Sequence, residues 1–312
     1  ILHATTVHTA DKAQFLTVRV QTGPDRPYAF LMTLLIPADP GPHPVVLTGD
    51  ACWRYATEAV TLDILRRGYI LAQFNRVELA ADVYRPDRTS GIYLAHPEKE
   101  YGALAAWAWG YHRCVDVLTA MDSVDPSRIA IVGHSRGGKT TLLAGATDPR
   151  IALTGANNSG AGGAGCFRRQ GPQSETLKDL TGIIDYWFGP RFKDYVGRET
   201  ELPFDQHFLK ALIAPRPLLT CEALGDLWAN PSGTRQTHLA AREVYRFLGA
   251  EERLGIWFRD GEHSHGWEDW MAFLDFADLQ FGRARPARTF NQDPFADQPL
   301  AFAWRAPRAG GR

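Results

Sequence analysis

The chain has 312 residues, 45% of them hydrophobic, so it is long enough to bury a large core in a single domain. Its 34 basic and 35 acidic residues leave a formal net charge of −1 without a basic run or an acidic tail, which argues against nucleic acid or an anionic membrane as the main partner. No apolar run approaches the length of a membrane span. The four cysteines (Cys52, Cys114, Cys166 and Cys221) lack Cys-x-x-Cys spacing, so neither a zinc site nor a redox dithiol is expected.

Hydrophobic periodicity predicts strands that alternate with helices along most of the chain. The expected strands are residues 14–20 and 29–36, an antiparallel pair, then 45–48, 69–74, 129–132, 151–156, 217–221 and 254–258. The expected helices are residues 57–67, 103–121, 140–146, 175–188, 203–212, 233–248 and 267–281. Residues 75–102 show no clear period and are expected to form a long surface excursion. This alternation is typical of an α/β fold with a mostly parallel central sheet flanked by helices on both faces. We expect one domain over residues 1–282 and a C-terminal tail over residues 283–312.

A glycine-rich turn, Gly133-His134-Ser135-Arg136-Gly137, joins the strand at 129–132 to a helical segment. A Gly-x-Ser-x-Gly sequence between strand and helix is the nucleophile elbow of the α/β-hydrolase fold, where the glycines permit the tight turn that exposes the serine hydroxyl. The alternative is a glycine-rich turn whose serine only caps a helix. The two consecutive glycines after the serine, Gly137-Gly138, favour the elbow. The sequence therefore predicts Ser135 as a nucleophile.

Candidate partners for this serine follow two later strands. Asp226 comes after the strand at 217–221, and His263 and His265 come after the strand at 254–258. A serine hydroxyl becomes nucleophilic when an imidazole takes its proton, and a carboxylate must hold that imidazole in the right tautomer. The order serine, acid, histidine is that of an α/β-hydrolase, which predicts acyl transfer to water. The choice of base stays open, with a slight preference for His263. Considered singly, the aspartate could instead be a turn former and each histidine an exposed loop residue.

The negative oxygen of the tetrahedral intermediate needs hydrogen-bond donors. The N–H of Arg136 follows the nucleophile and is expected to face that oxygen, and its guanidinium would add a charge-assisted donor if it folds over the same site. The loop after the strand at 45–48 is expected to supply another N–H. The alternative for Arg136 is a surface ion pair.

The sequence Gly133-His134-Ser135-Arg136-Gly137-Gly138-Lys139 resembles the Gly-x-Ser-Arg-x-Gly-Lys motif of the glucuronoyl esterases, carbohydrate esterase family 15. The resemblance covers roughly residues 107–281 and continues through the segments at 159–163, 168–169, 174–176, 202–207, 211–217 and 226–228. It implies an esterase without a cofactor that cleaves the bond between the 4-O-methyl-glucuronic acid of glucuronoxylan and a lignin alcohol. It also implies that Lys139 and Glu175 bind sugar hydroxyls and that Trp228 lies against the uronate. From the residues alone, a solvated Lys139 and a helix-capping Glu175 would be the simpler interpretation.

Two features depart from the fungal members of that family, the position of the triad acid and a disulfide. The fungal triad acid is a glutamate at the position of Asn158, and an amide cannot hold an imidazolium as a carboxylate does, so Asp226 is the expected acid, as in bacterial members. The fungal disulfide would join the positions of His134 and Gly266, so it is not expected here. The fungal His-x-His-Cys pattern, in contrast, would favour His265 as the base.

Two other functions remain open at this point. An acetyl-xylan deacetylase could use the same triad, but an acetyl group offers nothing for Lys139 and Glu175 to bind. A catalytically inactive carbohydrate-binding module is disfavoured by the intact set of candidate catalytic residues. A polymeric substrate would imply a secreted or periplasmic protein. The chain begins at Ile1 without a signal peptide, which is expected of a mature or trimmed form.

Overall fold

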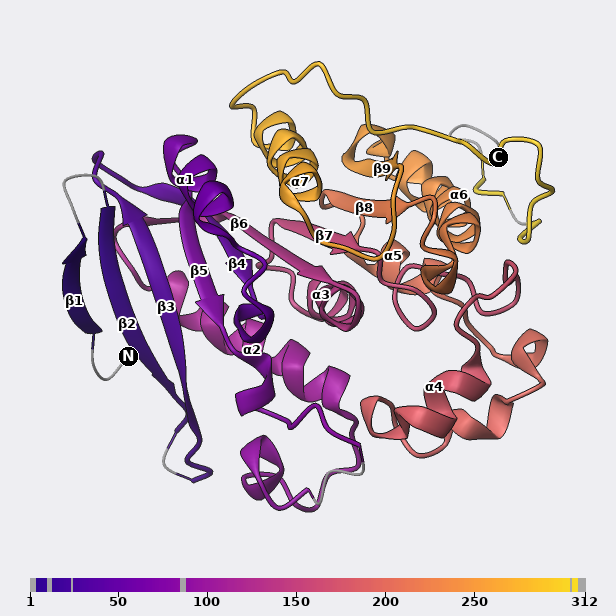
Figure 1. Ribbon diagram of the computed structural model, residues 1–312, viewed down its shortest axis with the longest axis horizontal. Coiled ribbons are helices and arrows are strands. Elements are labelled where there is room, and N and C mark those ends of the chain that lie inside the picture. The colour runs from indigo at the N-terminus through magenta and orange to yellow at the C-terminus, as the bar shows by residue number, and fades with distance from the viewer. Residues whose placement is uncertain (1–3, 10–12, 24, 85–87, 304, 308–312) are drawn as a thin grey trace.

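One twisted sheet organises the molecule (Figure 1). The computed structural model describes residues 4–9, 13–23, 25–84, 88–303 and 305–307. Within these residues the sheet has nine strands in the order β1-β2-β3-β5-β4-β6-β7-β8-β9. Pairing is antiparallel from β1 through β3 to β5 and parallel from β5 to β9, which confirms the predicted mostly parallel sheet. The strands are β1 Ala4–Thr9, β2 Ala13–Gln21, β3 Ala29–Pro37, β4 His43–Thr48, β5 Ile70–Phe74, β6 Val124–His134, β7 Leu153–Asn157, β8 Leu218–Ala223 and β9 Leu254–Arg259.

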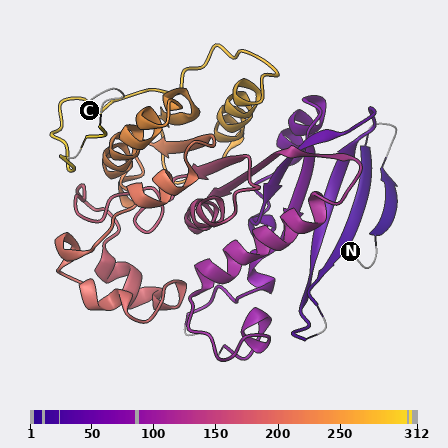
Figure 2. The same cartoon turned by 180° about the vertical axis from the view of Figure 1, so that it is seen from behind.

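Helices cover both faces of the sheet. Alternate strand residues point to opposite sides, and apolar side chains on both sides need to be buried. Val46, Leu71 and Ala130 pack against α1 and α7, whereas the neighbouring Leu47 and Ala72 belong to the core under α2. Figure 2 shows α2 and α3 in front of that second face. A third cluster joins α3, α5 and α6 to β7, β8 and β9. The helices are α1 Glu58–Arg66, α2 Ala103–Leu118, α3 Arg136–Thr147, α4 Leu177–Ile183, α5 His207–Ile213, α6 Pro231–Phe247 and α7 Trp267–Gln280.

The strand β1 was not among the expected strands, and two further segments differ from their sequence-based predictions. The helix expected over 175–188 is the short α4, which a capping box of Thr176 and Asp179 begins, followed by a separate 3-10 turn at Asp185–Trp187. The segment at 75–102 is not only a surface excursion. It buries Leu79 and Ile92 in the core, and Trp107 Nε1 donates to the Ala80 carbonyl at 2.9 Å. These contacts are made by isolated residues in 3-10 turns and loops. Such segments have no hydrophobic periodicity from which a sequence could predict their burial.

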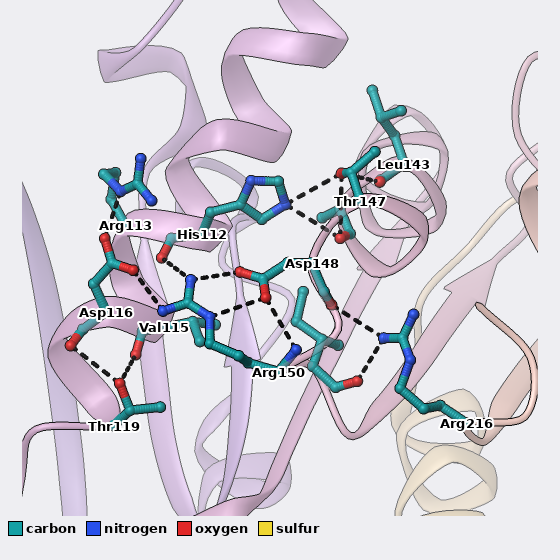
Figure 3. Close-up of polar contacts among 12 residues, drawn as sticks. His112, Arg113, Val115, Asp116, Thr119, Leu143, Thr147, Asp148, Arg150 and Arg216 are labelled. Carbon is teal, nitrogen blue, oxygen red and sulfur yellow. Dashed lines mark hydrogen bonds and ion pairs between the residues drawn. The ribbon is translucent and has the colours of Figure 1, made fainter. Parts of the chain in front are cut away.

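A network of arginines and carboxylates ties α2, α3 and β7 together at the amino-terminal end of the parallel strands (Figure 3). Arg150 donates to Asp148 through Nε at 3.0 Å and Nη2 at 2.6 Å, and to Asp116 through Nη1 at 2.6 Å. Arg216 donates to the carbonyls of Asp148, Ile151 and Gly145 at 2.7 to 3.1 Å. Since Ser135 follows the carboxyl end of β6, this network lies at the opposite end of the sheet from the candidate site.

The described residues after α7 run along the surface and form neither a helix nor a strand among themselves. They nevertheless pack against the domain, because Arg235 pairs with Asp293 through two contacts of 2.9 Å and Ile256 N–H donates to the Phe290 carbonyl at 2.8 Å. Across the described part of the chain, no helix is both long and apolar enough to span a membrane.

Candidate active site

Ser135 lies at the sharp turn between β6 and α3. Its backbone angles are φ 55° and ψ −123°, a conformation that is strained for a residue with a side chain and typical of a nucleophile elbow. The flanking glycines are required by space, since a Cβ at Gly133 would lie 2.5 Å from the Gly137 carbonyl and one at Gly137 would lie 2.3 Å from the Asp50 carboxylate. Ser135 N–H donates to the Asn157 carbonyl at 2.9 Å, which anchors the turn to β7.

Asp226 and His263 form a close pair beside this turn. His263 Nδ1 lies 2.5 Å from Asp226 Oδ2, and the His263 ring lies 4.4 Å from the ring of His134, the residue before Ser135. Asp226 is buried while 42% of the His263 side chain is exposed. Burial pushes the pKa of Asp226 upward, but hydrogen bonds from His263 and Asn158 outweigh it and leave that pKa below its usual value. The pair can therefore present a carboxylate to one imidazole nitrogen.

His265 has different surroundings. Its ring is buried and stacks on Trp270 at 4.7 Å, and neither ring nitrogen has a hydrogen-bond partner among the described residues. Burial lowers the pKa of His265 to about 3, and the charge of Arg259 adds to this effect. His265 is therefore a neutral, buried aromatic ring, and no carboxylate among the described residues orients it.

Asn158 interacts with the same carboxylate that His263 contacts. Its Nδ2 donates to Asp226 Oδ2 at 2.7 Å, and the Ala229 N–H donates to Oδ1 at 3.3 Å. Asn158 thus supports the acid rather than replacing it. Sequence reasoning considered Asn158 only as a lost carboxylate and missed this contact.

Backbone contacts join the loops that carry the acid and the histidine. Leu224 N–H donates to the Arg259 carbonyl at 2.8 Å, and Gly225 N–H donates to the Gly261 carbonyl at 2.9 Å. The Arg259 side chain also donates to Asp269 at 2.7 Å and to the Ser264 hydroxyl at 2.7 Å. These bonds fix the His263 loop relative to Asp226, and sequence analysis gave no signal for the role of Arg259.

Arg136 is the first residue of α3, so its N–H has no acceptor within the helix and is free to face an oxyanion. In the loop after β4, the N–H groups of Gly49 and Asp50 are used within the fold, donating to Tyr111 at 2.7 Å and Thr48 at 3.2 Å. The Arg136 guanidinium lies above the ring of Trp187 at 4.7 Å and pairs with Asp82. It is therefore held against the protein beside the nucleophile.

Lys139 and Glu175 meet in a buried ion pair next to the glycine-rich loop after β7. Lys139 Nζ lies 2.6 Å from Glu175 Oε2, with 3% and 6% of the two side chains exposed, and also donates to the Ala161 carbonyl. Burial lowers the pKa of Lys139, and the Glu175 charge partly opposes that shift. The simpler interpretation from the residues, a solvated lysine and a capping glutamate, is therefore wrong. Glu175 N–H donates to the Trp228 carbonyl at 2.9 Å, and 49% of Trp228 is exposed beside it.

The candidate catalytic residues differ in exposure, since Ser135 and His263 are partly exposed and Asp226 is buried. A cavity of about 920 Å³ lies behind Lys139, with Trp187, Phe188 and Phe192 in its walls, but its lining does not include Ser135 or its partners. His263 and Trp228 lie outside this cavity and are exposed to solvent. All four cysteines are free, so no disulfide braces the site.

The family model of fungal glucuronyl esterases matches residues 18–249, about three quarters of the chain. The chain belongs to the glucuronoyl esterase family. It is 36% identical over 239 residues to a 4-O-methyl-glucuronoyl methylesterase of Podospora anserina, a match that covers 73% of this chain and 48% of that protein. The chain thus spans about half the length of the curated relatives it matches.

Solved structures of glucuronoyl esterases share the architecture. The carbohydrate esterase family 15 enzyme from Caldicellulosiruptor kristjansonii is 30% identical, with a TM-score of 0.83 over 98% of this chain and 85% of that one. A variant of the Sporotrichum thermophile enzyme in complex with methyl 4-O-methyl-β-D-glucopyranuronate is 26% identical, with a TM-score of 0.74 over 92% of this chain and 78% of that one. These likenesses confirm the α/β-hydrolase fold and the glucuronoyl esterase resemblance expected from the sequence.

Proposed function

We propose that this protein is a serine esterase that hydrolyses the ester between the 4-O-methyl-glucuronic acid of glucuronoxylan and a lignin alcohol. The observation that carries the proposal is the Asp226–His263 pair beside the strained Ser135 turn, with Lys139 and Glu175 buried together next to it. Membership of the glucuronoyl esterase family supports the reaction class. The polymeric substrate of the proposed reaction supports a secreted or periplasmic location.

Each residue has a role that follows from its position. Ser135 Oγ attacks the ester carbonyl while His263 takes its proton, and Asp226 stabilises the imidazolium that forms. The N–H and the guanidinium of Arg136 bind the negative oxygen of the tetrahedral intermediate. His263 then protonates the departing alcohol, and a water that His263 deprotonates releases glucuronate from Ser135 by the same steps in reverse order.

Substrate selection is assigned to the polar pair and the exposed indole. Lys139 and Glu175 bind hydroxyls of the uronate ring, and Trp228 packs against its face. A uronate hydroxyl adds hydrogen bonds to this pair that a simple acetate cannot make, so acetate is the poorer substrate. This selection distinguishes the proposed activity from acetyl-xylan deacetylation on the same triad.

Hydrolysis of benzyl glucuronate, compared with that of 4-nitrophenyl acetate, tests the proposal. The wild-type protein should have the higher kcat/KM for the glucuronate ester. Ser135→Ala should abolish both activities and labelling by a fluorophosphonate, with an unchanged circular dichroism spectrum. His263→Ala should abolish burst-phase acylation. Faster turnover of acetate would favour the deacetylase, and a protein whose Ser135 is not labelled would favour a binding module.

A further inference from the structure

One carboxylate outside the candidate triad accepts hydrogen bonds from the side chains of three other residues. This carboxylate is Asp82, in the segment between β5 and α2. Arg136 Nη1 donates to both of its oxygens, at 3.1 and 3.0 Å. Tyr186 donates to it at 2.8 Å and Trp187 Nε1 at 3.2 Å. Arg76 Nη2 lies 3.6 Å away as an ion pair. Only 8% of the Asp82 side chain is exposed, so these donors replace water around it.

The Arg136 side chain is confined by these contacts. Its guanidinium lies 4.7 Å from the Trp187 ring centre and 5.3 Å from that of Trp53. Nη1 is occupied by Asp82, and Nε is buried without a hydrogen-bond partner among the described residues. A free arginine side chain carries about 2 kcal/mol of rotamer entropy, which must be lost before it can bind an oxyanion. Here much of that freedom is already removed.

Asp82 is itself anchored to the elbow through a second ion pair. Arg76 is fully buried and donates to Asp50 Oδ1, and the other oxygen of Asp50 accepts the His134 N–H at 2.8 Å. Trp53 lies 4.0 Å from the Arg76 guanidinium and so packs beside both arginines. These contacts lead from the backbone of His134, before Ser135, through Asp50, Arg76 and Asp82. They end at the side chain of Arg136, after Ser135. Asp82 is therefore fixed relative to the nucleophile and not only to its own loop.

We propose that Asp82 is a positioning residue that holds the Arg136 guanidinium where the oxyanion forms. The inference rests on the proposed esterase function. Donors that are in place before the reaction need no reorganisation when charge develops, which is the main source of oxyanion stabilisation. Asp82 acts through Arg136 and does not touch the substrate. Its effect therefore belongs to the transition state, so kcat should depend on it more than KM.

A double-mutant cycle with Asp82→Asn and Arg136→Gln tests this role. Loss of one oxyanion donor lowers kcat by about a hundredfold or more, so Asp82→Asn, which loosens but keeps the donor, should lower kcat by about tenfold with KM within about twofold. In the Arg136→Gln background, Asp82→Asn should cause no further loss of kcat. An equal loss in both backgrounds would assign Asp82 a purely structural role and overturn the proposal.

Two further variants separate positioning from folding. Tyr186→Phe removes one donor to Asp82 without changing charge, so it should lower kcat by a few fold in the wild type and not in Arg136→Gln. Asp148→Asn is the control, because Asp148 is likewise buried, with 6% of its side chain exposed, and pairs with an arginine, Arg150 (Figure 3). It precedes β7 and so lies at the opposite end of the sheet from Ser135. The control variant should lower the melting temperature and leave kcat unchanged. A loss of kcat in Asp148→Asn as large as that in Asp82→Asn would overturn the proposal.

Measuring the cycle on two substrates separates the test of this inference from the test of the proposed function. The oxyanion forms in the hydrolysis of any ester, so the cycle is measured on both benzyl glucuronate and 4-nitrophenyl acetate. Non-additive losses on acetate in a protein that does not turn over glucuronate would reject the proposed substrate and support the role of Asp82. Additive losses on both esters in an active glucuronate hydrolase would reject the role of Asp82 alone.

Discussion

Asp226→Asn is the variant whose effect the geometry defines most closely. The two donors at 2.5 and 2.7 Å, His263 Nδ1 and Asn158 Nδ2, both face Oδ2. If the asparagine places its side-chain oxygen at the Oδ2 position, both contacts are kept. Its amide nitrogen then takes the Oδ1 position, 3.3 Å from the Ala229 nitrogen, where two donors face each other. The opposite orientation places an amide N–H against two donors. We therefore expect the histidine tautomer to be kept and only the negative charge to be lost.

The size of the loss follows from that charge. Two unit charges in contact attract by about 4 kcal/mol at an effective dielectric constant near 20, so the imidazolium of the transition state loses about that much stabilisation. Each 1.36 kcal/mol is a factor of ten in rate, which gives a loss of about a thousandfold in kcat. If the tautomer also reverses, the loss approaches about ten-thousandfold.

The assay is steady-state hydrolysis of benzyl glucuronate, with Asn158→Ala as the control. Asn158→Ala removes one hydrogen bond to the acid and keeps its charge, so it should cost about tenfold or less. A larger loss in Asn158→Ala than in Asp226→Asn, or an Asp226→Asn variant within tenfold of the wild type, would refute the assignment. Glu222 is the carboxyl that would then need testing. Burial raises the pKa of Glu222 to about 8, however, so it is largely protonated at neutral pH and poorly suited to hold an imidazolium.

Three further outcomes are expected. His265 has a pKa lowered to about 3 by burial, against about 6.5 when unfolded, so its contribution to stability is complete above about pH 6.5 and falls by up to about 1.4 kcal/mol per pH unit as the pH drops toward 3. In His265→Phe the melting temperature should therefore decline less steeply between pH 7 and 4, and equal slopes would contradict this. Trp228→Ala, at a half-exposed position, should raise KM for glucuronate esters several-fold with little change in melting temperature; a large drop in stability would instead indicate a core role. Replacing both members of the buried pair, Lys139→Met with Glu175→Gln, should lower kcat/KM for glucuronate by about ten- to a hundredfold and spare acetate, whereas either single change leaves an unpaired buried charge and should destabilise the fold by about 3–5 kcal/mol. Equal losses on both esters would show that the pair serves the fold or the triad.

The fold and the main catalytic candidates were predictable because their signals are local. The elbow is a contiguous motif whose glycines are required by contacts within a few residues, and the carboxyl ends of parallel strands bring Asp226 and the two histidines to one edge. The choice between His263 and His265 was not predictable. The two rings are two residues apart in one loop, and only packing against Trp270 buries the second while the first faces the acid. The assignment of His263 as the base stays a prediction until acylation is measured.

Contacts between distant segments could not be found in the sequence. Asp82 lies in a stretch without periodicity, and its donors come from α3 and from a 3-10 turn more than a hundred residues later. Arg76, in the same stretch, pairs with Asp82 and with Asp50. The buried ion pair of Lys139 and Glu175 was not predicted either. The family resemblance implied only that both residues bind sugar hydroxyls. Charged residues in loops are solvated by default, so a sequence gives no reason to bury them in advance.

The two ion-pair assemblies beside Ser135 have a common consequence for the proposed reaction. Hydrolysis converts a neutral uronate ester into a carboxylate next to the cations of Arg136 and Lys139. Each cation is already paired, with Asp82 at 3.0 Å and with Glu175 at 2.6 Å. An unpaired cation would attract the product carboxylate by up to about 4 kcal/mol, roughly a thousandfold in affinity, and would slow its release. A paired cation still offers N–H donors at short range, where the transition-state oxygen forms. In the proposed reaction, the pairing therefore weakens retention of the product carboxylate while N–H donors remain for the transition-state oxygen.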